Sequence, residues 1–103
     1  MSWAEIVRLD PPKVVARGDV AAIYTHAFRF SFRPDLVEAL KAAIPWHDRA
    51  WDEGVRTWYV TQPHLDTLKA LALSCDEATL VEGKVTTDVK SGRVTEQLEM
   101  FGG

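Results

Sequence analysis

Residues 24–32 of the chain read YTHAFRFSF. Every second residue of this stretch is aromatic or histidine. From Arg29 onward the residues that alternate with them, Arg29, Ser31 and Arg33, are polar. Successive side chains of a β-strand point to opposite faces of a sheet, so this alternation predicts a strand with one buried face and one solvent-facing one. It is the clearest strand in the sequence, and it places His26 among packed aromatic side chains.

A β-hairpin is predicted to lead into this strand. Val14–Arg17 and Val20–Tyr24 read as two strands, and the two residues between them suit a tight turn because Gly18 tolerates positive φ. The Pro11-Pro12 pair is expected to end any element that precedes the hairpin.

Two helices and a second hairpin follow. Pro34 suits the first position of a helix whose apolar residues recur at helical spacing up to Ile44, and Pro45 ends it. Residues 48–51 and 56–61, separated by a loop that contains a glycine, predict the second hairpin. Pro63 begins a helix that reaches Cys75, and residues 79–81 add a short strand. We therefore expect residues 1–81 to form an α+β domain, a small antiparallel sheet with two helices packed on it, in the order strand-strand-helix-hairpin-helix.

The composition fits one small domain. The chain has 103 residues, of which 47% are hydrophobic, enough for one core and too few for two. No apolar run reaches the roughly 20 residues that span a bilayer, and the first residues lack the features of a signal peptide, so we expect a cytoplasmic protein. Cys75 is the single cysteine, which rules out an internal disulfide and a cysteine-based metal cage.

The net charge of −3 argues against strong non-specific affinity for DNA. Residues 1–75 hold nine basic and nine acidic side chains, whereas residues 76–103 hold three basic and six acidic ones. The deficit therefore lies near the C-terminus, and the rest of the chain can still display a local basic face.

The C-terminal segment, residues 82–103, is expected to be a flexible tail. From Glu82 to Glu96 the sequence is polar and aperiodic, which is typical of a tether. Random-coil scaling gives such a tether an average reach of about 20–25 Å.

The tail ends in Gln97-Leu98-Glu99-Met100-Phe101, followed by two glycines. This run resembles the Gln-Leu-x-Leu-Phe peptide by which bacterial polymerases and repair proteins dock on the replication sliding clamp. Polar neighbours cannot bury Leu98, Met100 and Phe101, so these side chains suit a pocket on another protein, and the Gln97 amide can orient the peptide. Met100 replaces the usual leucine with a flexible side chain of similar volume. We expect about micromolar affinity, and the alternative is a terminus that packs on its own domain.

A second resemblance covers residues 22–75. A strand leads into a helix with Lys41 near its end, then come Trp51-Asp52, the Arg56-x-Trp58 strand and a helix rich in leucine. This order resembles the HARP domain of annealing helicases, and it implies a small accessory domain that handles branched or partly single-stranded DNA. The chain has no Gly-x-x-x-x-Gly-Lys-Ser/Thr phosphate loop and no room for a helicase motor, so annealing driven by ATP hydrolysis is excluded.

The residues best suited to nucleic acid combine positive charge with aromatic rings. Arginine holds phosphates, and an aromatic ring stacks on an unpaired base for about 1–3 kcal/mol. The alternative is that Trp51 and Trp58 belong to the core and the charges solvate the surface. The candidate DNA-binding residues are Arg29, Arg33, Lys41, Arg49, Arg56 and Trp58, with Trp51 and Tyr59 as further stacking surfaces.

Catalytic and metal-binding patterns are lacking. The histidines at 26, 47 and 64 have no helical i, i+4 pair, and the adjacent acids at 52–53 and 76–77 do not converge on one substrate. We therefore expect no enzyme, cofactor or metal.

Two functions remain open from the sequence. In the first, the chain is an accessory protein of DNA replication or repair, from a bacterium or a phage, that docks on the clamp through its tail and binds DNA through its domain. In the second, it is a clamp-binding regulator or inhibitor that competes with polymerases and whose domain binds protein instead of DNA. An open basic face would favour the first function, and an acidic or apolar face would favour the second.

Overall fold

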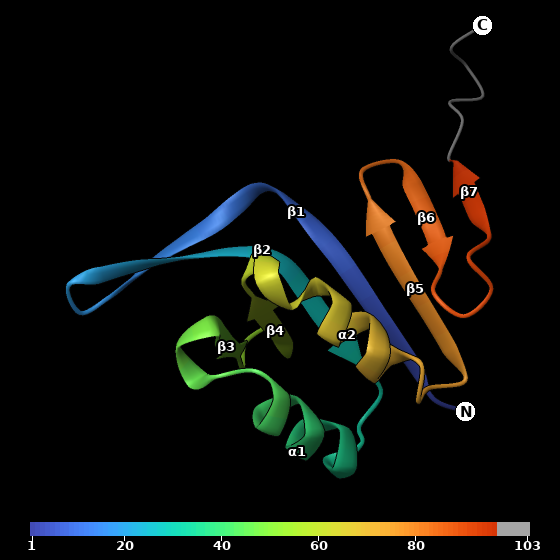
Figure 1. Ribbon diagram of the computed structural model, residues 1–103, viewed down its shortest axis with the longest axis horizontal. Helices are drawn as coiled ribbons and strands as arrows, with labels where there is room; N and C mark the ends of the chain where they lie inside the picture. Colours follow the sequence, from blue (N-terminus) through green and yellow to red (C-terminus); the bar gives the residue numbers. More distant parts are fainter. Residues whose placement is uncertain (97–103) are drawn as a thin grey trace, which may run out of the picture.

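The fold is dominated by one seven-stranded mixed sheet that carries two helices on one face (Figure 1). It is seen in a computed structural model of the chain, and the structure describes residues 1–96. The strands are β1 (Trp3–Arg17), β2 (Val20–Phe30), β3 (Arg49–Asp52), β4 (Thr57–Val60), β5 (Glu77–Glu82), β6 (Val85–Asp88) and β7 (Val94–Glu96). Their order across the sheet is β3-β4-β2-β1-β5-β6-β7. β1 and β5 run parallel, and every other neighbouring pair is antiparallel.

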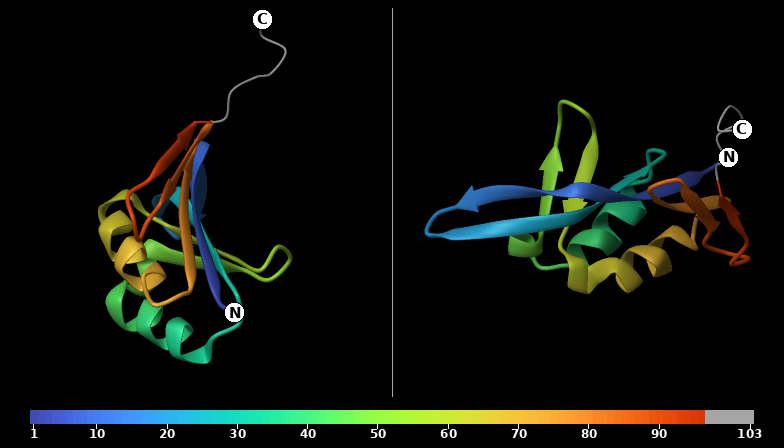
Figure 2. Two further views of the ribbon diagram at one scale, coloured as in Figure 1. Left: turned by 90° about the vertical axis from the view of Figure 1, so that its right-hand side faces the viewer. Right: turned by 90° about the horizontal axis from the view of Figure 1, so that it is seen from above.

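The two helices lie where the sequence predicts them. α1 (Pro34–Ala43) begins at its proline and buries Leu36 and Leu40, and α2 (Leu65–Ala72) buries Leu68 and Ala72. The short 3-10 turn η1 (Trp46–Asp48) follows Pro45. A second one, η2 (Gln62–His64), contains Pro63, so α2 begins two residues after the predicted start. Figure 2 shows both helices on one side of the sheet, and the β3–β4 hairpin projects on the other side.

The core forms between this helical layer and the middle of the sheet. Phe28 of β2, Ile6 of β1 and Val60 of β4 are fully buried beneath Leu40 and Leu68. Tyr24, His26 and Phe28 are buried as the alternation predicts, and Phe30 is half-buried where β2 ends. Ala27 is buried as well, so the other face is exposed only from Arg29. Phe32 lies beyond the strand and leaves the core, with 88% of its surface exposed. The predicted turn at Gly18 is also confirmed, with φ of 63° at that glycine.

The expectation of a small antiparallel sheet is wrong. The first strand begins at Trp3, eleven residues before the predicted start at Val14, and it adds β5 as a parallel neighbour through Trp3–Val7. The prolines at 11 and 12 do not end this strand, because a shift in its register between Arg8 and Lys13 absorbs them. Prolines are tolerated at such irregularities and along edges, where no ladder hydrogen bond is lost. The result is a mixed sheet in which strands outweigh helices.

The expected tether is also replaced by structure as far as Glu96. Residues 82–96 form the end of β5, the strands β6 and β7 and their turns, so the predicted boundary after residue 81 falls inside β5. Gly83, with φ of 63°, turns β5 directly into β6 through the facing pair Glu82 and Val85. These strands lie toward the edge of the sheet and bury little, so their sequence needs no apolar face. Residues 97–103, which hold the clamp-like motif, lie outside the described part of the chain.

Between residues 1 and 96, no helix has the length and apolar character required to cross a membrane.

Candidate nucleic-acid interface

A groove of about 570 Å³ lies between α1, the end of β2 and the β3–β4 hairpin. It is the place where most of the predicted DNA-binding residues meet. Its walls consist of aromatic and aliphatic side chains interrupted by three cations and one carboxylate. The lining residues are Phe28, Arg29, Phe30, Phe32, Val37, Lys41, Trp51, Glu53, Arg56 and Trp58.

Two tryptophans from facing strands form the aromatic wall. The register of the hairpin places Trp51 of β3 directly opposite Trp58 of β4, and their ring centroids are 5.1 Å apart at 47°. Trp58 faces Phe28 of β2 on its other side and is 8% exposed, so it belongs to the core as the alternative interpretation held. Trp51 is 45% exposed, so one of the two rings remains open to solvent. Trp51 is therefore the better stacking surface.

The tip of the hairpin holds Trp51 in a defined orientation. The indole N–H of Trp51 donates to Oε2 of Glu53 at 2.7 Å. The backbone N–H of Gly54 donates to Oδ1 of Asp52 at 2.9 Å, a local turn-forming contact. Arg56 then adopts φ of 49°, the left-handed region that few non-glycine residues enter. Polar contacts along the tip thus fix the ring before any ligand arrives.

The cations of the groove are available to a ligand. Arg29 extends from β2, Lys41 from the last turn of α1 and Arg56 from the hairpin, and all three are exposed. Within residues 1–96 none of the three makes an ion pair or a side-chain hydrogen bond. Glu53 is the one carboxylate in the lining, which leaves an excess of two positive charges. Free guanidinium and ammonium groups beside exposed aromatic rings match the chemistry of a phosphate backbone with unpaired bases.

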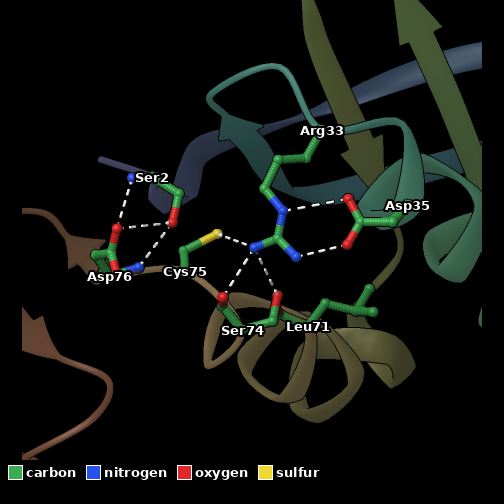
Figure 3. A network of polar contacts seen from close by, with 7 residues as sticks. All are labelled: Ser2, Arg33, Asp35, Leu71, Ser74, Cys75 and Asp76. Atoms are coloured by element: carbon green, nitrogen blue, oxygen red, sulfur yellow. Dashed lines mark hydrogen bonds and ion pairs between the residues drawn. The ribbon is translucent and has the colours of Figure 1, made fainter.

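Arg33, predicted to bind DNA, has a structural role instead (Figure 3). Its guanidinium pairs with both carboxylate oxygens of Asp35, the shorter contact being 2.6 Å, and donates to the carbonyl oxygen of Ser74 at 2.8 Å. The hydrogen bonds that Arg33 donates to the Asp35 carboxylate raise the pKa of Arg33 and lower the pKa of Asp35. The side chain therefore joins the start of α1 to the end of α2 and lies outside the groove lining.

Arg49 and Tyr59 also fall outside the groove. Arg49 opens β3 opposite Val60, at the far end of the hairpin from its tip. The Tyr59 ring packs beside Tyr24 at 6.4 Å between centroids, and the Lys13 ammonium lies 4.4 Å above it. The structure thus brings together Arg29, Lys41, Arg56 and Trp58 from the predicted set, with Trp51 from the predicted stacking surfaces, and leaves Arg33 and Arg49 out.

Sequence reasoning missed five of the ten lining residues. Phe28, Phe30 and Phe32 were assigned to the buried face of the strand, Val37 to the apolar face of the helix that begins at Pro34, and Glu53 to the solvated acids of the turn. The position of Phe32 at the end of the alternating stretch could have shown that it is exposed, because residues beyond the end of a strand leave the core. Nothing in the sequence shows that Glu53 accepts the indole hydrogen of Trp51.

The histidines do not form a site. His26 is buried on β2, its Nδ1 lies 2.8 Å from the Thr25 hydroxyl, and burial lowers its pKa. Nε2 of His64 contacts Oδ2 of Asp48 at 2.9 Å. Within the described 96 residues no three histidine, cysteine or acidic side chains are grouped closely enough to hold a metal ion.

The last described strand, β7, lies far from the groove. β7 forms the opposite edge of the sheet from β3, and the residue after β7 is Gln97. The chain was compared with protein-family models, with curated proteins and with solved structures, and none of them matches it.

Proposed function

We propose that the protein is a non-enzymatic accessory of DNA replication or repair. Its groove binds unpaired DNA, and its C-terminal Gln97–Phe101 peptide docks on a bacterial sliding clamp in the cytoplasm. The observation that carries the first part is the grouping of an open tryptophan with three unpaired cations around one groove. The second part rests on the sequence of the motif.

Single-stranded DNA suits the groove better than a duplex does. An unpaired base offers an aromatic face, and Trp51 and Phe32 offer exposed rings on which bases can stack. Arg29, Lys41 and Arg56 then lie on the walls, where the phosphates of the same strand would pass. The excess of two positive charges is small, so DNA affinity should fall with salt only as steeply as about two or three phosphate contacts require.

A matched pair of tryptophan variants tests DNA binding by the groove. Trp51→Ala removes the exposed tryptophan of the groove, whereas Trp46→Ala removes a tryptophan that is 67% exposed and does not line it. We expect fluorescence anisotropy with a labelled oligothymidylate to show binding at low salt that Trp51→Ala weakens by about tenfold or more. Trp46→Ala should bind like the original protein. Equal effects of the two changes, or no binding, would contradict the DNA part of the proposal.

Calorimetry tests the clamp part separately. The full chain and a Leu98→Ala/Phe101→Ala double variant are titrated into a bacterial sliding clamp. We expect about micromolar binding by the full chain and none by the variant, because the two anchors supply most of the apolar burial. The double variant should keep its affinity for the oligonucleotide. Binding that survives the double change would remove the motif from the proposal.

A second function for the domain is favoured by the apolar share of the groove. Six of its ten lining residues are aromatic or aliphatic, and Phe32 alone is 88% exposed. Such a surface also fits a protein partner, as in a clamp-binding regulator or inhibitor. Salt distinguishes the two, because DNA affinity falls as the ionic strength rises, with a slope set by the few phosphate contacts, whereas an apolar protein contact does not weaken.

A further inference from the structure

The outer half of the β1–β2 ribbon forms an arm that extends beyond the rest of the sheet. We define the arm as residues 13–24, which pair in antiparallel register from Lys13 and Tyr24 to Arg17 and Val20. In Figure 1 it reaches the left edge of the molecule, away from both helices, and Figure 2 shows the same extension from above.

One face of the arm is apolar and open. Val14 lies opposite Ile23, and Ala16 lies opposite Ala21, so the alternation of side chains places these four residues on the same face. All four are exposed, with 63% of Val14 and 53% of Ile23 accessible to solvent. Monomeric proteins rarely leave such residues together in the open without a partner for them.

The backbone edges of the arm are open as well. β1 pairs with β5 only through Trp3–Val7, and β2 pairs with β4 only through His26–Phe28. Within residues 1–96 neither outer edge of the arm has a neighbouring strand. An isolated two-stranded ribbon is at best marginally stable in water, and natural sheets protect open edges with charges or prolines. In the arm the charges lie at its base and at its turn, Lys13, Arg17 and Asp19, whereas residues 14–16 and 20–23 between them contain neither a charge nor a proline.

We propose that the arm is a dimerisation surface and that its partner is the arm of a second copy of this chain. The apolar face carries no charge, so it complements an identical face without leaving an unpaired ion. A two-fold arrangement brings the same patch of both copies together, which is the commonest way in which soluble chains associate. The partner arm packs its own apolar face on this one, and so stabilises a ribbon whose edges have no neighbouring strand within residues 1–96.

Charge favours a second copy over the nucleic acid proposed for the groove. The four residues of the face offer no cation to a phosphate backbone. The arm as a whole holds Lys13, Arg17 and Asp19, a net charge of +1, and the Lys13 ammonium already lies over the Tyr59 ring. Phosphate neutralisation, which supplies most non-specific affinity for DNA, is therefore weak at the arm.

Sedimentation velocity on the full chain, from about 1 to about 300 μM, tests this dimer over the affinities expected of small interfaces. The test variant is Val14→Glu/Ile23→Lys, which makes the face polar. The two opposite charges face each other across the ribbon and support it. The matched control is Val94→Lys, which charges an exposed valine of the edge strand β7.

We expect the original protein and the Val94→Lys control to dimerise as concentration rises, and the arm variant to dimerise at least about tenfold more weakly, because two charges would have to be buried. A monomer throughout the range overturns the proposal. So does an arm variant that dimerises like the original, or a dimer that Val94→Lys removes while the arm variant keeps it.

Hydrogen exchange on the original protein provides a test that does not depend on folding of the arm variant. We expect the amides of residues 14–16 and 21–23 to exchange more slowly as the protein concentration rises, because the dimer covers the face to which they belong. Exchange that is independent of concentration overturns the proposal, and so does protection that appears only when DNA or another protein is added.

Discussion

Replacing Glu53 by glutamine should strengthen DNA binding by the groove. Glu53 is the one carboxylate among the lining residues, so Glu53→Gln raises the excess positive charge of the lining from two to three. The glutamine oxygen can still accept the indole hydrogen of Trp51, which Glu53 now accepts at 2.7 Å. The change therefore alters the charge and leaves the ring in place.

The expected gain follows from the charge removed. A unit charge at about 4 Å from a phosphate contributes about 1 kcal/mol in water and less at greater distance, so we expect affinity to rise by about two- to fivefold at low salt. One further phosphate contact would steepen the slope of log affinity against log salt by up to about 0.7. Fluorescence anisotropy with an oligothymidylate, measured across a salt series, gives both quantities.

Glu96→Gln is the control for this measurement. It changes the net charge of the chain by the same amount, but it lies in β7 at the opposite edge of the sheet from β3. Equal gains in the two variants would show that net charge is responsible and the groove is not. Unchanged or weaker binding by Glu53→Gln would refute the placement of the DNA strand.

Three further predictions concern the domain itself. Arg33→Gln should lower the thermal unfolding midpoint because it breaks the link between α1 and α2, while oligonucleotide affinity stays within about twofold. Burial lowers the pKa of His26 below 6.5, so the unfolded chain binds the proton more readily than the folded one. The free energy of unfolding, measured with urea, should therefore be highest above pH 6.5 and should fall as the pH drops below it. In His26→Gln this pH dependence should disappear. Leu68→Ala should cost about 2–5 kcal/mol in the same assay, because Leu68 is fully buried, whereas Leu73→Ala at 49% exposure should cost about 0.5 kcal/mol or less.

The elements with strong local signals were predictable. Pro34 and Pro45 delimit α1, Gly18 marks the first turn, and the alternation up to Phe30 marks β2. Each signal acts within a few residues, where sterics and periodicity determine the backbone. The two helices and the β3–β4 hairpin could therefore be found without any knowledge of their partners.

The long-range pairings were not predictable from the same signals. Trp3–Val7 lacks a distinctive alternation and becomes a strand because β2 and β5 pair with it on either side. Residues 85–88 and 94–96 are polar strands whose stability comes from the neighbouring strand, so their composition resembles that of a linker. The tether was misassigned for this reason.

The residues of the candidate site were also predictable only in part. Lys41 and Arg56 could be nominated from residue type, and the structure places both on the groove. Arg33 has the same residue type as Arg56, but the fold brings Asp35 and Ser74 to its guanidinium, and no sequence rule reports that meeting. Trp51 and Trp58 differ in role because one strand lies at the edge of the sheet and the other lies inside it.

As far as Glu96, the structure has strands at fixed spacing where a flexible tether was expected. A flexible tether would let the distance between the groove and Gln97 vary widely. Here the last three residues before Gln97 are part of β7. The six inter-strand spacings from β7 to β3 amount to about 29 Å along the sheet. In the proposed function, with the tail docked on a clamp, the sheet fixes how far the groove lies from Glu96, and residues inserted between Glu96 and Gln97 would lengthen the separation without altering either proposed binding surface.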